Sequence, residues 1–449
     1  MTDVAPAPGL RRNRNWQFLW WGQAVSLVGD YVFDTTVVLW VAAVIAKDQP
    51  WGPAAVGGVL IAASVPMLAV GSFAGVYVDR WNRRRTMLAT DLIRAAIIAA
   101  MLVVPALGDR LSVTAQLVLV YAGVFAVSCT SQFFNPARFA TIGAVVHPED
   151  QPRAGGLSQA TAAMAAIIGP PLAAPLLFSV GVQWALAVNA ASFLISYAAV
   201  YAIRIGAGPE AAHADGEPKR RSFGREYSEG LKFFARNKVL QTIGISVVIV
   251  MLGVGALNAL DVFFVTENLH ADASLLGTLA ASFGVGSVVG ALLAGAIGGK
   301  VGIGRLYWIG LLFMGLALIG YSRTTTLAPA FVLLFLAGVP VAIVNSVVGP
   351  ILLRVTPAHM LGRIISLLTP LTQLAAILSM AAAGFLASTT LRDLHLEVAG
   401  VTFGRIDTIF LVGGVLTVAG ALWAAMRLRE VDRPAPEPSP EAESTPAPV

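Results

Sequence analysis

Long apolar segments recur along the whole chain, and they restrict its possible folds more than any other feature. Each is roughly 20 residues or more, the length that an α-helix needs to cross the hydrocarbon core of a membrane. Short polar breaks separate the segments. Twelve membrane-spanning helices are predicted, near residues 16–46, 53–78, 87–107, 113–134, 155–180, 182–203, 239–265, 273–298, 304–322, 327–348, 364–388 and 406–426.

The composition excludes a soluble protein. Of the 449 residues, 57% are hydrophobic and 12% are charged, whereas a soluble domain has about 25% charged residues. Such a chain cannot cover a water-facing surface, so we expect an integral membrane protein. The N-terminus is polar and the first apolar run is too long for a signal peptide, so that run is predicted to be a retained helix.

The basic residues predict the orientation. Most of the 30 Lys and Arg residues fall in alternate loops, and cytoplasmic loops are the ones enriched in these residues. Both termini are therefore predicted to be cytoplasmic, in a multi-pass protein of the bacterial inner (cell) membrane. The predicted external loops hold Lys47, Arg110, Arg323, Arg392 and Arg405.

A polar stretch at residues 204–238 divides the predicted helices six from six. We expect an N-terminal six-helix bundle at 1–203, a cytoplasmic linker at 204–238, a C-terminal bundle at 239–430 and a disordered cytoplasmic tail at 431–449, which is rich in Pro and Glu. The predicted fold class is an all-α membrane protein with two pseudo-symmetric six-helix bundles.

The two halves resemble each other in sequence. The loop after the fourth predicted helix reads FNPARFATIGAVVHPEDQPR, and the loop after the tenth reads VGPILLRVTPAHMLGR; each has a Pro, an Arg, a second Pro and a second Arg. Parallel six-helix repeats are typical of one large transporter architecture. The repeat therefore favours a transporter in which two bundles rock about a central site.

The stretch GDYVFD places Asp30 and Asp34 four residues apart within an apolar run. This spacing puts both acids on one face of a helix. An acid at the centre of a membrane helix costs about 2.5–3.5 kcal/mol, so we expect that face to line a cleft. Repulsion between the two charges and desolvation both favour the protonated form. The pair is therefore predicted to bind protons, attract cationic substrates, or both; alternatively, one acid caps a helix break or binds a neighbouring polar side chain.

Other candidates for the cleft lie on the first and seventh predicted helices. Asn258 and Asp261 occur late in the seventh helix, where they line the cleft or belong to the outer loop. Phe33 is an aromatic candidate beside the acids of the first helix. Aromatic faces suit flat cationic ligands, although aromatic residues in membrane proteins are more often lipid-facing.

The loop after the second predicted helix reads GVYVDRWNRRR. Its spacing, Gly-x-x-x-Asp-Arg-x-x-Arg-Arg, resembles the signature of the major facilitator superfamily, and the resemblance extends over the whole chain. It implies a cytoplasmic latch that holds the outward-facing state. By this resemblance the latch is formed by Asp79 and Arg83, with Arg80 and Arg84 beside them and Gly75 allowing close approach. Asn82 stands where the family usually has Gly, and we expect it to tolerate a left-handed turn.

Three more charged residues are assigned to the same cytoplasmic layer. Asp91 and Arg94 lie three residues apart in the third predicted helix, and can pair with each other or with Asp79 and Arg83. The pair is either a structural charge network or part of a proton relay. Arg138 follows the fourth predicted helix, at a place matched by Arg354 after the tenth. Either arginine is a candidate to pair across the halves.

The fifth predicted helix contains GGLSQATAAMAAIIGPPLAAP. Its Gly156, Gly169 and Pro170 match the spacings of the superfamily's antiporter signature, which favours export. The alternative is close helix packing through small residues. The stretches NRNWQFLWWGQAVSLVGD, FFNPARFATI and AVNAASFLISY also resemble a bacterial branch of drug and siderophore exporters.

Several chemistries have no matching motif in the sequence. We find no Walker loop for ATP and no His/Cys metal cluster, and we expect no cofactor, no metal, no enzymatic activity and no nucleic-acid partner. Transport must then be driven by an ion gradient or by the substrate's own gradient. We predict a monomeric, lipid-embedded, proton-coupled exporter (an antiporter) of amphiphilic drugs or related small molecules. Alternatives are a siderophore or natural-product exporter, a nutrient uptake symporter and a non-transporting membrane sensor.

Overall fold

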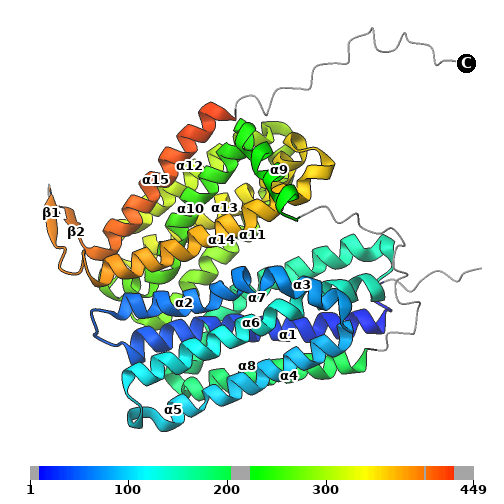
Figure 1. Ribbon diagram of the computed structural model, residues 1–449. Coiled ribbons are helices and arrows are strands. Elements are labelled where there is room, and N and C mark those ends of the chain that lie inside the picture. Colours follow the sequence, from blue (N-terminus) through cyan, green and yellow to red (C-terminus); the bar gives the residue numbers. More distant parts are fainter. Residues whose placement is uncertain (1–9, 204–222, 399–400, 429–449) are drawn as a thin grey trace, which may run out of the picture.

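The structure is a computed structural model that describes residues 10–203, 223–398 and 401–428. Among these residues, twelve helices are long and apolar enough to span a membrane, which confirms the predicted number. Figure 1 shows them in two groups lying side by side, blue to cyan-green and green to red. The predicted tail at 431–449 and the polar run 204–222 lie outside the described residues.

The N-terminal half comprises residues up to Ala202. Its α-helices are α1 (Arg14–Trp40), α2 (Gly52–Ala69), α3 (Gly71–Arg80), α4 (Arg83–Met101), α5 (Val103–Leu107), α6 (Val113–Val145), α7 (Gln151–Pro175) and α8 (Val182–Ala202). Short π-helical turns extend α1 and α7, as η1 (Val41–Ile45) and η4 (Leu176–Val180), and 3-10 turns occur at η2 (Gly108–Arg110) and η3 (Pro148–Asp150).

The C-terminal half begins with a helix that the sequence did not predict, α9 (Phe223–Arg236). The others are α10 (Lys238–Phe263), α11 (Leu276–Val301), α12 (Ile303–Ser322), α13 (Leu327–Val355), α14 (Ala358–Ser388) and α15 (Arg405–Arg427). A π turn η5 (Phe264–Asn268) extends α10, and a 3-10 turn η6 (Ala273–Leu275) precedes α11. Strands β1 (Leu396–Val398) and β2 (Val401–Phe403) form an antiparallel hairpin between α14 and α15.

Helix α9 lies in the segment expected to be a polar linker. It is amphipathic: Phe234 packs against Gly244 and Leu368, while Lys232 and Arg236 lie on its more exposed side. An ion pair of 2.8 Å joins Arg363 of α14 to its Glu229. The sequence of α9 is too rich in charged residues to form a membrane span. The helix is stabilised instead by the burial of its apolar stripe against α10 and α14.

Matching caps in the two halves support the internal repeat. Asn13 accepts a hydrogen bond from the backbone of Trp16 at the start of α1, and its amide donates to the carbonyl of Val145 at the end of α6. Asn237 likewise caps the start of α10, with its amide donating to Val355 at the end of α13. The same cap is thus used at the same place in each half.

Prolines account for two differences from the predicted helices. The second span is divided at Val70 into α2 and α3, one turn after Pro66, whose missing N–H weakens the helix. The fourth span was expected to end at residue 134, before Asn135 and Pro136. Instead α6 continues through Pro136 to Val145, as membrane helices tolerate an internal proline when neighbours satisfy the freed backbone groups.

The halves meet at the end of the molecule that carries the β1–β2 hairpin, here called the hairpin end. Gly277 of α11 lies against the backbone of Pro170 in α7, and Gly384 of α14 lies against Pro53 of α2, with no room for a Cβ at either glycine. The backbone N–H of Ala54 also donates to Ser388 of α14, 3.1 Å away. Close helix contact through glycines therefore closes this end.

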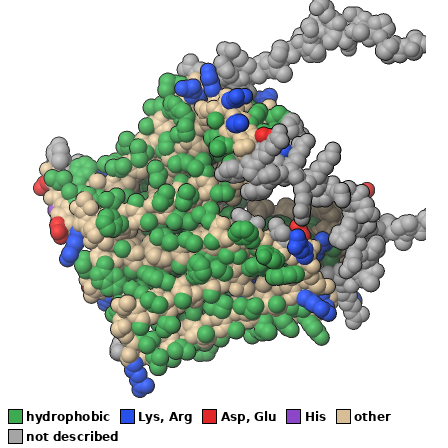
Figure 2. Space-filling view, in the orientation of Figure 1, with side chains coloured by type: hydrophobic (Ala, Val, Ile, Leu, Met, Phe, Trp, Pro, Cys, Tyr) green, Lys and Arg blue, Asp and Glu red, His purple; other side chains and the backbone are tan. Residues whose placement is uncertain are grey.

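The opposite end carries the starts of α1, α4 and α10 and is here called the basic end. Figure 2 shows the molecule hollowed between the two halves toward this end, with Lys and Arg side chains nearby. A Cβ at Gly75 of α3 or at Gly295 of α11 would meet nothing within 4 Å. The central cleft is therefore open at the basic end and closed at the hairpin end.

Candidate functional site

One face of α1 carries a polar stripe along the N-terminal half. Gln23, Asp30 and Asp34 are spaced by seven and four residues, which places them within about 40° of one another around a helix at 100° per residue. The exposed apolar residues Phe18, Trp21 and Val25 lie on the other face. Since that apolar face suits lipid, the stripe faces the interior, where Asp34 is exposed and Asp30 is partly exposed.

The two acids of the stripe have no fixed partners. Among the described residues, no hydrogen bond or ion pair joins either carboxylate to another side chain. In this conformation, therefore, neither acid binds a neighbouring polar side chain, which was the alternative considered above. Arg94 and Asp91 are the charged groups that act electrostatically on Asp30, and Asp30 acts on Asp34. Asp30 and Asp34 are thus two membrane-embedded carboxyl groups that are open to the cleft.

Asp91 and Arg94 pair with each other inside α4. The guanidinium of Arg94 donates to Asp91, and Ser196 of α8 donates to the other carboxylate oxygen at 2.8 Å. The rings of Phe134 and Phe193 lie 4.3 Å from the guanidinium carbon of Arg94. Asp91 is fully buried and Arg94 is 3% exposed, so this is an internal ion pair.

A hydrogen-bond chain extends from this ion pair across four helices. The amide of Gln23 in α1 donates to Ser196, 3.1 Å away, and Arg138 of α6 reaches the amide oxygen of Gln23 at 3.5 Å. The chain therefore connects Asp91 to Arg138 through Ser196 and Gln23. Neither Gln23 nor Ser196 was predicted, since uncharged polar residues are common in membrane helices and their spacing gave no signal.

The structure corrects the expected position of Arg138. It lies inside α6, partly buried and directed at α1, rather than in a loop after the fourth helix. Arg354 likewise lies inside α13. Arg138 is therefore part of the N-terminal half's own polar chain in this conformation and does not pair across the halves.

The expected latch is open in this structure. Asp79 is exposed, and among the described residues no hydrogen bond or ion pair joins its carboxylate to another group. Arg83 donates to the carbonyl of Ala140, and Arg84 donates to Val200 and Tyr201. Arg80 is exposed at the end of α3. The basic loop is thus tied to helix ends of its own half.

Three smaller expectations for the N-terminal half also differ from the structure. Asn82 is not left-handed; it has φ −68° and caps α4 by accepting from the backbone of Arg85. Gly75 faces open space instead of a close helix neighbour. Phe33 is 3% exposed within the core, because it lies on the side of α1 that packs on α8, so it does not line the cleft.

The residues of the antiporter-like motif occupy different positions in α7. Gly169 packs against Tyr31 and Val32 of α1, and Pro170 contacts Gly277 of α11. This part of the motif therefore lies where α7 meets both its own half and the other half. A Cβ at Gly156 would meet nothing within 4 Å, so no close packing explains this glycine here.

The C-terminal half also places a carboxyl group within a membrane-spanning helix. Asp261 of α10 accepts a hydrogen bond of 2.6 Å from the buried hydroxyl of Tyr321 in α12, and Phe264 packs on the Tyr321 ring. Asp261 is partly exposed, and Asn258, three residues earlier, is exposed. Tyr321 was missed because the contact joins residues 60 apart in sequence.

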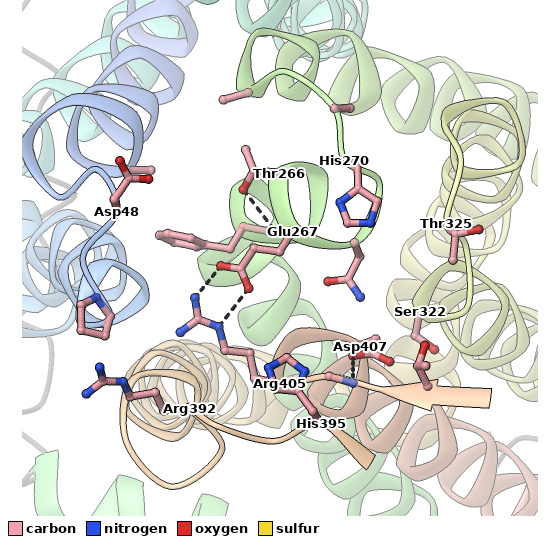
Figure 3. Close-up of a pocket in the computed structure, with 18 of the residues that line it drawn as sticks. Asp48, Thr266, Glu267, His270, Ser322, Thr325, Arg392, His395, Arg405 and Asp407 are labelled. Atoms are coloured by element: carbon pink, nitrogen blue, oxygen red, sulfur yellow. Dashed lines mark hydrogen bonds and ion pairs between the residues drawn. The ribbon is translucent and has the colours of Figure 1, made fainter. Parts of the chain in front are cut away.

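A cavity of about 1190 Å³ lies at the hairpin end, between the connections of both halves. Figure 3 shows Glu267 and Arg405 joined across it, by hydrogen bonds of 2.9 and 2.5 Å. Arg323 pairs with the buried Asp407 at 2.7 Å. The hydroxyl and backbone N–H of Ser274 hold the pKa of Asp272 below its usual value. Sequence reasoning did not identify this cavity, because loops distant in sequence form it.

These features define a class of protein: a membrane transporter with two similar halves around a central, one-sided cleft that contains carboxyl groups. Two proteins named for efflux are similar to this chain. Over 298 residues the chain is 26% identical to macrolide efflux protein A of Streptococcus pyogenes, covering 64% of this chain and 69% of that protein. Over 332 residues it is 26% identical to the multidrug efflux pump Tap of Mycobacterium bovis, covering 72% and 76%.

The fold is shared with solved transporters. The crystal structure of a bacterial homologue of the iron transporter ferroportin, in its inward-facing state, matches 95% of this chain and all of that chain with a TM-score of 0.71 at 14% identity. The family described as transmembrane secretion effector matches residues 5–442. The chain belongs to that family of major facilitator superfamily transporters; it is a multi-pass membrane transporter and not an enzyme.

Proposed function

We propose that this protein exports amphiphilic small molecules in exchange for protons. The observation that carries the proposal is the pair Asp30 and Asp34 on the inward face of α1, open to the cleft and without a fixed partner. Intramembrane carboxyl groups are costly and are usually functional. The efflux functions named for two relatives support export as the direction of transport.

The proposed cycle depends on the charge of these two carboxyl groups. When they are ionised, they attract a cationic substrate from the side to which the cleft is open. When they bind protons, the charge is lost and the substrate is released, so the halves can return through the membrane without an unpaired charge. Because two like charges one turn apart interact, we treat them as a pair that titrates together.

The basic end is proposed to be cytoplasmic, with both termini on that side, because the basic loops lie there. The structure is then an inward-open state. A latch between Asp79 and Arg83 would be expected to form only when the basic end closes, which is compatible with the exposed Asp79 described above. Asp261 with Tyr321 is proposed to be a second carboxyl site of the cleft.

The test is transport in proteoliposomes with an imposed pH gradient, using a fluorescent lipophilic cation. Asp34→Asn, Asp30→Asn and the double variant are expected to lose proton-driven accumulation while still binding the cation's neutral analogue. Asp393→Asn is the matched control, since that carboxyl is 96% exposed in the connection before β1. Accumulation at the wild-type level by all three α1 variants would refute the proton role.

A further inference from the structure

Arg138 is a cation without a counter-ion in the wall of the cleft. Its Nε atom is buried and has no hydrogen-bond partner, and its only side-chain acceptor among the described residues is the amide of Gln23 at 3.5 Å. No carboxylate of a described residue lies within ion-pair distance. The ring of Phe139 lies 4.9 Å from its guanidinium carbon, but a neutral ring supplies no counter-charge. Arg94, the charge that acts on Arg138, is itself a cation and is already paired with Asp91.

An arginine in a membrane-spanning segment normally pairs with a carboxylate or another acceptor, because an uncompensated charge is costly in low dielectric. Arg138 is thus positioned to receive an anionic group from elsewhere. Guanidinium binds carboxylates and phosphates through two parallel N–H donors. Here the buried Nε–H has no acceptor, and the partly exposed side chain offers its terminal N–H groups to a ligand.

The guanidinium lies in a groove between α1, α6 and α7. Trp16, Leu27 and Ile142 supply apolar walls, and Ser158 and Thr161 line the same groove. The indole of Trp20 is held in place by donating to Thr161 at 2.9 Å. The groove itself has a volume of about 10 Å³, room for about one water. A ligand would therefore reach Arg138 from the cleft, with the partly exposed Trp20 beside the cation.

The same α1 face connects this groove to the two acids. Gln23 contacts Arg138, and Asp30 lies seven residues further along α1, roughly 10 Å away at 1.5 Å per residue. Asp34 is one turn beyond. A positive site and a negative site therefore lie along one stripe, with apolar side chains between them and along their edge.

We propose that this wall of the cleft binds amphoteric substrates: an anionic group at Arg138, an ammonium group at Asp30 and Asp34, and an apolar body along Trp20 and Leu27. This rests on the proposed function for the role of the two acids as a cation site. It adds a charge requirement that a site for simple lipophilic cations lacks, and it assigns to Arg138 a substrate-positioning role distinct from the latch.

The proposal is tested by binding to the full chain in detergent at fixed pH, with no gradient. The probes are the tripeptide phenylalanyl-alanyl-phenylalanine, its C-terminal amide and its N-acetyl form, since three extended residues span roughly 10 Å. Wild type is expected to bind the free tripeptide about tenfold more tightly than the amide. Arg138→Gln should bring this ratio close to one, and should leave the preference for a free amine over the N-acetyl form unchanged.

Two further variants make the result decisive. Arg138→Lys keeps the charge and should retain part of the preference for the free acid, which guards against a folding defect in Arg138→Gln. Arg354→Gln removes the matching arginine of the other half and should keep the wild-type ratio. An unchanged ratio in Arg138→Gln, or a wild type that binds no free tripeptide or does not prefer it over the amide, overturns the proposal.

The proposed function fails separately from this inference. Asp30→Asn with Asp34→Asn should abolish the preference for the free amine while keeping the preference for the free acid. If the double variant pumps like wild type in the gradient assay but Arg138→Gln still loses the acid preference, the proton role is wrong and the anion site stands.

Discussion

Substitutions in the buried ion pair of Asp91 and Arg94 can show whether the pair stabilises the fold or relays protons. Replacing Asp91 by Ala leaves Arg94, which is 3% exposed between two phenylalanine rings, without its counter-ion. It also removes the acceptor of Ser196. Breaking one side of a buried ion pair costs about 3–5 kcal/mol, so the single variant is expected to be strongly destabilised.

The double variant Asp91→Leu, Arg94→Met should be much more stable than either single variant, since it removes both charges and fills a similar volume. Such replacements are often neutral or stabilising. Thermal unfolding in detergent measures the difference. For a half of this size, about 3–5 kcal/mol corresponds to a fall in Tm of roughly 6–20 °C, and the double variant should recover most of it.

Transport by the double variant then separates the two roles. Retained proton-driven transport identifies the pair as structural, whereas loss of transport in a stable double variant identifies a relay. The reasoning about burial is refuted if Asp91→Ala unfolds at the wild-type temperature, or if the two single effects simply add in the double variant. Glu229→Ala, which removes an ion pair of a partly exposed carboxylate, is the control and should shift Tm by little.

Three further outcomes are expected. Asp79→Asn should reduce transport and shift the population toward the conformation described here, because it removes a contact that only the opposite conformation makes. Labelling of cysteines placed in the cleft measures this shift, and full transport by the variant would count against the latch. Gly277→Leu should open the hairpin end, since no Cβ fits against Pro170; spectroscopic distances across α7 and α11 that match wild type would contradict this. A cysteine at Asp215, outside the described residues, should react with an impermeant reagent only from the cytoplasmic side, and labelling only from outside would reverse the proposed orientation.

Features set by neighbours along one helix were predictable from the sequence. Asp91 and Arg94 pair because residues three apart share a helix face, and the stripe of Asp30 and Asp34 follows from spacing four. Features that depend on which helix lies opposite could not be predicted from the sequence. Phe33 differs from Asp34 by one residue, yet it is in the core, because one step of about 100° turns it toward α8.

The sequence by itself therefore determined the number of membrane spans, their division into two similar halves and the presence of acids at membrane depth, because hydrophobicity and helical period are local properties. Only the tertiary structure decided that Asp91 connects through Ser196 and Gln23 to Arg138, that Tyr321 reaches Asp261, and that the cleft is closed at the hairpin end. Those contacts join residues far apart in the chain, and they depend on how helices pack rather than on what each helix is.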